Sequence, residues 1–125
     1  MNKDTLIKAA QEARKNAYAP YSHYNVGAAA LDEHGNIHAG CNIENASYGA
    51  TVCAERVAIF KLIAAGAKQV KALALVTANA APPCGICLQV LSELDNGDTE
   101  ILCAGDNGEE KRYTLAELLS HPFKL

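Results

Sequence analysis

The spacing of apolar residues along the chain predicts a helix followed by a pair of strands. Residues 4–17 place apolar side chains at the 3.6-residue spacing of a helix, and Asp4 is positioned to cap its start. Pro20 then ends the helical pattern, because proline disfavours helix at the residue before it. Residues 26–31 and 37–41 are two short apolar runs around a glycine-containing turn, which predicts a β-hairpin.

The middle of the chain predicts a buried helix and a buried strand. The helix should begin near residue 51 or 52 and run to about residue 65, with Gly66 just beyond its end. Its side chains are apolar almost all round, so we expect it to be central and covered on all sides. Residues 70–77 form a nearly continuous apolar run, as in a strand covered on both faces.

The last third of the chain completes an α/β pattern. It predicts a helix over 84–94, strands over 100–104 and 111–114, and a capping box at 114–117 that opens a short C-terminal helix. The order α-ββ-α-β-α-β-β-α predicts one domain over residues 1–125. Its fold class is an α-β-α sandwich with a mixed, roughly five-stranded sheet led by the hairpin.

Composition narrows the possible partners. A chain of 125 residues, half of them hydrophobic, can form one soluble domain with a real core. The net charge of −3 and the absence of a basic run argue against a nucleic-acid partner. No stretch has the apolar length of a signal peptide or a membrane helix, so we expect a cytoplasmic protein without a membrane partner.

The cysteines indicate metal chemistry more than disulfides. There are five of them, an odd number in a chain without an export signal. Cys84 and Cys87 are three residues apart at a predicted helix start, so their side chains face the same way. Cys53 lies at the start of another predicted helix. Three thiolates at two helix N-termini would suit a catalytic zinc, which takes three protein ligands and leaves one position open.

Two neighbours of Cys53 could complete such a site. Glu55 lies two residues beyond a ligand and can reach over the open position, where it would move protons between water and a substrate. Arg56 could donate to the thiolates and so compensate part of their charge. The pattern Cys-Ala-Glu followed by Pro-Cys-x-x-Cys resembles the signature of zinc-dependent base deaminases.

Two other interpretations of the cysteines stay open at this point. Cys84-x-x-Cys87 after a strand is also the arrangement of thioredoxin-like redox proteins, although that role does not need Cys53 or Glu55. A purely structural zinc would require a fourth ligand from Cys41, Cys103 or one of the four histidines, and no spacing favours any of them.

Over nearly its whole length the chain resembles the small, homotetrameric class of zinc-dependent cytidine deaminases. The matching segments are Ala17–Ser22, Val26–Ala29, Gly40–Gly49, Cys53–Arg56, Pro83–Gly85, Cys87 and Gln89–Leu91. The resemblance implies hydrolysis of cytidine and deoxycytidine to uridine and deoxyuridine with release of ammonia, a reaction of pyrimidine salvage. Glu55 would pass protons to N3 of the ring and then to the leaving amine.

The resemblance also implies which residues contact the nucleoside. Asn42 and Glu44 match the positions that hydrogen-bond the ribose hydroxyls, and Tyr24 stands where the family usually has phenylalanine. The backbone near Ala54 and Cys84 would read the amide face of the pyrimidine. Phe123 resembles the aromatic residue that each subunit contributes to a neighbouring pocket, so the site would be completed only in the oligomer.

Two departures from the family pattern bear on activity, substrate range and assembly. Leu88 follows the last cysteine, where the family usually has arginine, so Arg56 is left to compensate the thiolates alone. The chain also stops two residues beyond Phe123. A related substrate, such as an N4-modified cytidine or a nucleoside antibiotic, is therefore the alternative to cytidine.

Overall fold

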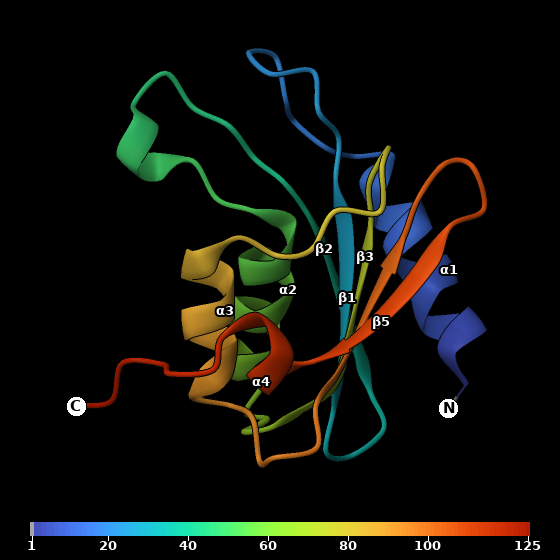
Figure 1. The fold of residues 1–125 in the computed structure, drawn as a ribbon. Helices are drawn as coiled ribbons and strands as arrows, with labels where there is room; N and C mark the ends of the chain where they lie inside the picture. Colours follow the sequence, from blue (N-terminus) through green and yellow to red (C-terminus); the bar gives the residue numbers. More distant parts are fainter. Residues whose placement is uncertain (1) are drawn as a thin grey trace.

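A five-stranded mixed sheet forms the centre of the computed structural model, which describes residues 2–125 (Figure 1). The strands lie in the order β2-β1-β3-β4-β5. Their bounds are Gly27–Asp32 for β1, Ile37–Cys41 for β2, Val70–Val76 for β3, Glu100–Ala104 for β4 and Glu110–Thr114 for β5. Only β3 and β4 pair in parallel, and the other neighbours are antiparallel. The predicted mixed sheet led by a hairpin is therefore confirmed.

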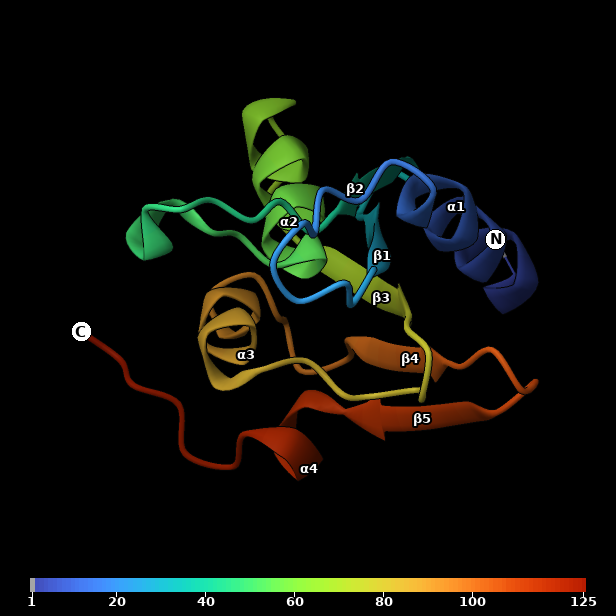
Figure 2. The ribbon, with the colours of Figure 1, turned by 90° about the horizontal axis from the view of Figure 1, so that it is seen from above.

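Helices cover both faces of this sheet. They are α1 (Lys3–Arg14), α2 (Ala54–Ala64), α3 (Gly85–Ser92) and α4 (Leu115–Leu118). Seen along the sheet, α1 lies on one side, and α2, α3 and α4 lie on the other (Figure 2). Each face has its own apolar core, one formed under α1 and the other under the remaining helices. The α-β-α arrangement predicted from the sequence is confirmed.

The packing of α1 on the sheet depends on a very close approach between its backbone and Gly27 of β1. Leu6, Ile7 and Ala10 are its buried residues. A Cβ atom on Gly27 would lie 1.9 Å from the carbonyl oxygen of Ala10, so no residue with a side chain fits there.

The predicted cap of α1 was wrong: Asn2, not Asp4, accepts the hydrogen bond from the Thr5 amide at 2.9 Å. Asp4 lies inside the first turn, where its charge still suits the positive end of the helix.

Helix α2 begins later than the sequence predicts and is buried on one face only. Val52 pairs with Ile43 in an isolated β-bridge, so the chain is still extended there and the helix starts at Ala54. Ala58, Ile59 and Leu62 face the core, but Phe60 and Ile63 each remain 46% exposed. The prediction that α2 is covered all round is therefore wrong for the single chain, because only one side of the helix meets the sheet and α3.

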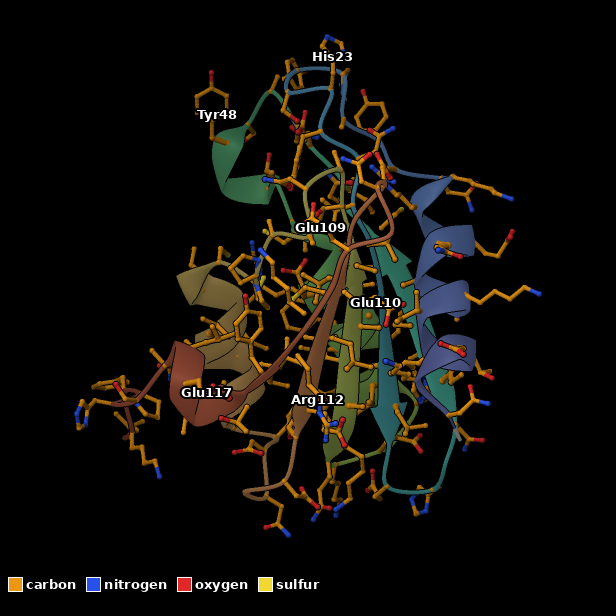
Figure 3. The ribbon with its side chains drawn as sticks, turned by 45° about the vertical axis from the view of Figure 1, so that its right-hand side comes forward. His23, Tyr48, Glu109, Glu110, Arg112 and Glu117 are labelled. Atoms are coloured by element: carbon orange, nitrogen blue, oxygen red, sulfur yellow. The ribbon has the colours of Figure 1, made fainter. Side chains whose placement is uncertain are left out.

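Charged side chains mark the outer edge of the sheet at β5. Figure 3 shows Glu110 and Arg112 on this strand, with Glu117 on the short helix that follows. Glu110 pairs with Lys3 at 3.1 Å, and Arg112 pairs with Glu100 at 3.0 Å. Charges on an edge strand oppose pairing with a further strand.

Within residues 2–125, no helix is both long enough and apolar enough to cross a membrane.

Candidate active site

A cavity of about 280 Å³ lies where β3 ends and both α2 and α3 begin. Its lining comes from four segments, 22–26, 42–44, 51–55 and 75–84. The connecting loops that carry these residues gather beyond one end of the sheet, at the top of Figure 1. The cavity is just below the ~300–1,000 Å³ range of small-molecule sites, so it suits a small ligand.

The three cysteines predicted to act together converge beside this cavity. Cys53 and Cys84 are the N-cap residues of α2 and α3, and Cys87 lies in the first turn of α3. The Sγ atom of Cys84 lies 3.8 Å from that of Cys53 and 3.6 Å from that of Cys87. Neither N-cap side chain makes a capping hydrogen bond. Both sulfurs are therefore free to point at a common centre.

The spacing of the sulfurs fits a tetrahedral metal. Three thiolates at a Zn–S distance of ~2.3 Å in a tetrahedral shell would lie about 3.8 Å from one another. All three ligand atoms lie within 4.8 Å of one another. Among residues 2–125, neither Cys41, Cys103 nor a histidine belongs to this cluster. The donor set thus offers three ligands and leaves one position for water or substrate.

Local electrostatics favour a deprotonated sulfur at Cys53 and a protonated sulfur at Cys87. A hydrogen bond from the Cys87 thiol, assisted by the Arg56 guanidinium, lowers the pKa of Cys53 to about 5. The same hydrogen bond raises the pKa of Cys87, so that sulfur keeps its proton when Cys53 is ionised. Arg56 Nη2 lies 3.4 Å from Cys53 Sγ, while its Nε is buried without a hydrogen-bond partner. The Arg56 guanidinium therefore contacts the sulfurs, and within residues 2–125 it pairs with no carboxylate.

Glu55 is a buried carboxyl next to the sulfurs. Its side chain lines the cavity, and the residue is only 4% exposed. Burial away from water raises the pKa of Glu55 to about 7. A carboxyl with a pKa near neutrality can both accept and return a proton, as a general acid–base catalyst requires.

Asn42 and Glu44 line the cavity and also hold its loops together. Asn42 accepts from the Val26 amide at 3.0 Å and donates to the Tyr24 carbonyl at 2.7 Å. Glu44 accepts from the backbone amides of Tyr21 and Ser22 and from the Ser22 hydroxyl, and this last bond lowers the pKa of Glu44. An amide and a carboxylate each keep further hydrogen-bonding capacity after these bonds. Both side chains can still contact a ligand.

The remaining predicted residues fall into two groups. Tyr24 and the fully buried Ala54 line the cavity. Phe123 does not line the cavity of its own chain; it is 69% exposed, and its backbone N–H and C=O both bond to the Gln89 amide. Leu88, at the position of the expected arginine, is buried in the apolar core.

Sequence reasoning missed several residues of the lining. Ser22 and Thr77 contribute to it, and Asn79 bonds to the Tyr24 hydroxyl. Ser22 lay inside a segment that matched the family pattern, so the match was a usable signal for that residue. Thr77 and Asn79 follow a strand without any motif, and nothing in the sequence distinguishes them from ordinary loop residues.

Three cysteines that could hold a metal ion, with a buried carboxyl next to them, are the arrangement expected of a metal-dependent hydrolytic site. Comparison with known proteins agrees with this class. Residues 1–104 match the family model of the cytidine and deoxycytidylate deaminase zinc-binding region. The chain therefore belongs to the cytidine and deoxycytidylate deaminase family.

Individual relatives match over almost the full length of the chain. The cytidine deaminase of Halalkalibacterium halodurans is 46% identical over 125 residues, covering 98% of this chain and 95% of the relative. A cytidine deaminase of Mycobacterium tuberculosis is 45% identical over 118 residues, with 93% and 85% covered. The crystal structure of cytidine deaminase from Burkholderia pseudomallei superposes with a TM-score of 0.93 at 41% identity, covering 98% of this chain and 100% of that one.

Proposed function

We propose that this protein hydrolyses cytidine and deoxycytidine to uridine and deoxyuridine with release of ammonia, as in pyrimidine salvage. The convergence of Cys53, Cys84 and Cys87 beside the buried Glu55 carries the proposal. The names of the relatives that match over nearly the full chain support cytidine as the substrate.

Zinc is the metal that we propose for the three thiolates. The sulfur spacing and the single open position both suit it, and the matching family model is described as zinc-binding. When bound, zinc supplies a water made acidic enough to act as a nucleophile near neutral pH. Arg56 offsets part of the negative charge that three thiolates would otherwise leave at the metal.

Glu55 moves the protons of the reaction. As the water oxygen forms a bond to C4 of the pyrimidine, Glu55 accepts a proton from that water and delivers it to N3. It then takes the remaining proton of the new hydroxyl group and delivers it to the amino group. The C4–N bond breaks, ammonia leaves, and C4 keeps a carbonyl oxygen. The raised pKa of Glu55, about 7, suits both directions of transfer.

The lining of the cavity supports the proposed contacts to the rest of the nucleoside. Asn42 and Glu44 bind the ribose hydroxyls with the hydrogen-bonding capacity that their loop contacts leave free. The backbone near Ala54 and Cys84 contacts the amide edge of the base, and Tyr24 packs against the ring. An N4-modified cytidine or a nucleoside antibiotic is the second candidate substrate, because Leu88 stands where the family usually has arginine.

The test is a cytidine assay combined with metal quantification on one preparation. We expect ultraviolet absorbance to report loss of cytidine, with about one zinc per chain by elemental analysis. Rates on a panel with deoxycytidine and N4-methylcytidine assign the preferred substrate. Absence of turnover on every member by zinc-loaded protein would contradict the proposed reaction.

A homotetramer in which Phe123 enters a neighbouring pocket completes the proposal. Phe60, Ile63 and Phe123 expose apolar surface on the single chain, and such surface is commonly covered in an assembly. The C-terminal segment runs past α3 and extends away from the sheet (Figure 2). Sedimentation of the assayed preparation gives the number of chains. The cytoplasmic location expected from the sequence stays a prediction.

Arg56 provides a more specific prediction about the metal. Arg56→Ala should speed zinc loss to a chelator by about tenfold or more, because the charge-assisted bond to Cys53 disappears and Leu88 offers no substitute. The release rate is measured with a chromogenic chelator. The same substitution in a relative with arginine after its last cysteine serves as the reference. If zinc loss were accelerated equally in both proteins, Arg56 would not be the only residue that compensates the charge of the thiolates.

A further inference from the structure

We propose that Asn79 is a positioning residue that holds the Tyr24 ring in one orientation as part of the nucleoside pocket, and thereby sets substrate affinity. Tyr24 Oη donates to Asn79 Oδ1 at 2.6 Å. Tyr24 lines the cavity, and Asn79 lies just outside it, between the lining residues Thr77 and Ala81. The inference rests on the proposed function, because it concerns the pocket in which the nucleoside would bind.

The backbone of Tyr24 is already held before its hydroxyl is considered. Its amide donates to Ser22 Oγ at 3.1 Å, and its carbonyl accepts from Asn42 Nδ2 at 2.7 Å. Ser22 also donates to Glu44. The side chains proposed to bind ribose therefore fix the tyrosine backbone, and only the ring needs a further partner.

Asn79 is a firm anchor for that ring. It forms an isolated β-bridge with Gly105, and the neighbouring Ala78 carbonyl accepts from the Asp106 amide at 3.2 Å. On its other side, Ala80 is buried with a φ of 55°, a conformation that residues other than glycine rarely adopt. The surrounding contacts thus determine the backbone on both sides of Asn79.

Arg14 links segment 22–26 to segment 75–84 a second time, indirectly through Asp106. Its Nε donates to the Asn25 carbonyl at 2.8 Å, and its Nη1 pairs with Asp106 Oδ1 at 2.6 Å. Asn25 directly follows Tyr24, and Asp106 bonds to the residue before Asn79. Loss of the Tyr24 hydroxyl would therefore leave the two segments connected, so that the ring and not the loop gains freedom.

A ring that is fixed in advance lowers the cost of binding. Ordering a free side chain on binding costs about 0.5–1.5 kcal/mol, which corresponds to about two- to twelvefold in affinity. Among the hydrogen bonds of residues 2–125, none joins Asn79 to Glu55 or to the three cysteines. We therefore expect the contact to affect KM and to leave the proton transfers unchanged.

The experiment is a double-mutant cycle on the zinc-loaded protein with cytidine. Tyr24→Phe and Asn79→Ala should each raise KM about three- to tenfold with kcat changed less than about twofold, and the double variant should be no worse than either single variant. Asn79→Asp keeps an acceptor for the hydroxyl and should restore KM to within about threefold of the wild type.

Tyr113→Phe is the matched control, since its hydroxyl makes no hydrogen bond in the described structure and it lies on the edge strand β5. It should leave both constants unchanged. Single effects that multiply in the double variant, an Asn79→Asp variant as impaired as Asn79→Ala, or losses confined to kcat would each overturn the positioning role. A wild-type protein inactive on cytidine would overturn the proposed function, and this inference with it.

Discussion

Glu55→Gln should lower kcat for cytidine by about a thousandfold or more, with zinc content and fold intact. The substitution keeps the size of the side chain and removes only its ability to carry a proton. General acid–base groups contribute roughly 10²–10⁴-fold to a rate, and here one carboxyl serves both proton transfers. Glu55 is not a member of the sulfur cluster, so its substitution should not weaken metal binding. Steady-state kinetics with zinc analysis of the same sample measures both quantities.

The control is Glu12→Gln on α1, an exposed carboxylate whose bonded partner is Lys15. It should have no effect on turnover, since exposed ion pairs contribute little even to stability. A Glu55→Gln protein with a rate near that of the wild type would show that another group moves the protons. Loss of zinc from that variant would instead assign Glu55 a role in metal binding.

The burial of Glu55 also predicts a cost in stability. Its folded pKa, about 7, is above the ordinary value of 4.5, so folding favours the protonated carboxyl. The contribution is fully present below the unfolded pKa and is lost as the pH rises through about 7. At pH ~8, metal-free Glu55→Gln protein should therefore be more stable to urea than metal-free wild type, by up to about 3 kcal/mol.

Local patterns in the sequence were sufficient for the sheet, the helices and the convergence of the three cysteines. Helix and strand periodicities depend on neighbouring residues, and the three cysteines lie at helix starts that those periodicities locate. Boundaries were less accurate. Helix α2 starts at Ala54 because Val52 pairs with Ile43, a residue nine positions away, and no local pattern reports that pairing.

Features that depend on long-range contacts could not be predicted. The bond from Tyr24 to Asn79 joins residues 55 positions apart, and the ion pair from Arg14 to Asp106 joins residues 92 positions apart. Each partner alone is an ordinary loop or helix residue. The exposure of Phe60 and Ile63 was missed for a related reason, because periodicity shows that a helix is apolar but not how many of its faces the same chain covers.

Cys84→Ser should abolish zinc binding and lower activity by about a thousandfold or more, without loosening the helix that carries the ligand. Cys84 is the N-cap of α3, and its side chain makes no capping bond. Serine is among the preferred N-cap residues and contributes ~0.5–2 kcal/mol to helix stability when it bonds to the first turn. The effects on metal binding and on helix stability therefore have opposite signs. Elemental analysis, cytidine kinetics and thermal unfolding of metal-free protein separate them.

Cys53→Ser repeats the experiment at the N-cap of α2, and Cys41→Ser is the control at a cysteine outside the cluster. Both ligand variants should lose zinc while their metal-free forms unfold at or above the temperature of metal-free wild type, and Cys41→Ser should retain zinc. This pattern also decides between the interpretations of the Cys84-x-x-Cys87 motif. A redox protein would tolerate Cys53→Ser, whereas a three-thiolate metal site loses its metal with either cysteine, because two sulfurs cannot provide the three ligands that its geometry requires.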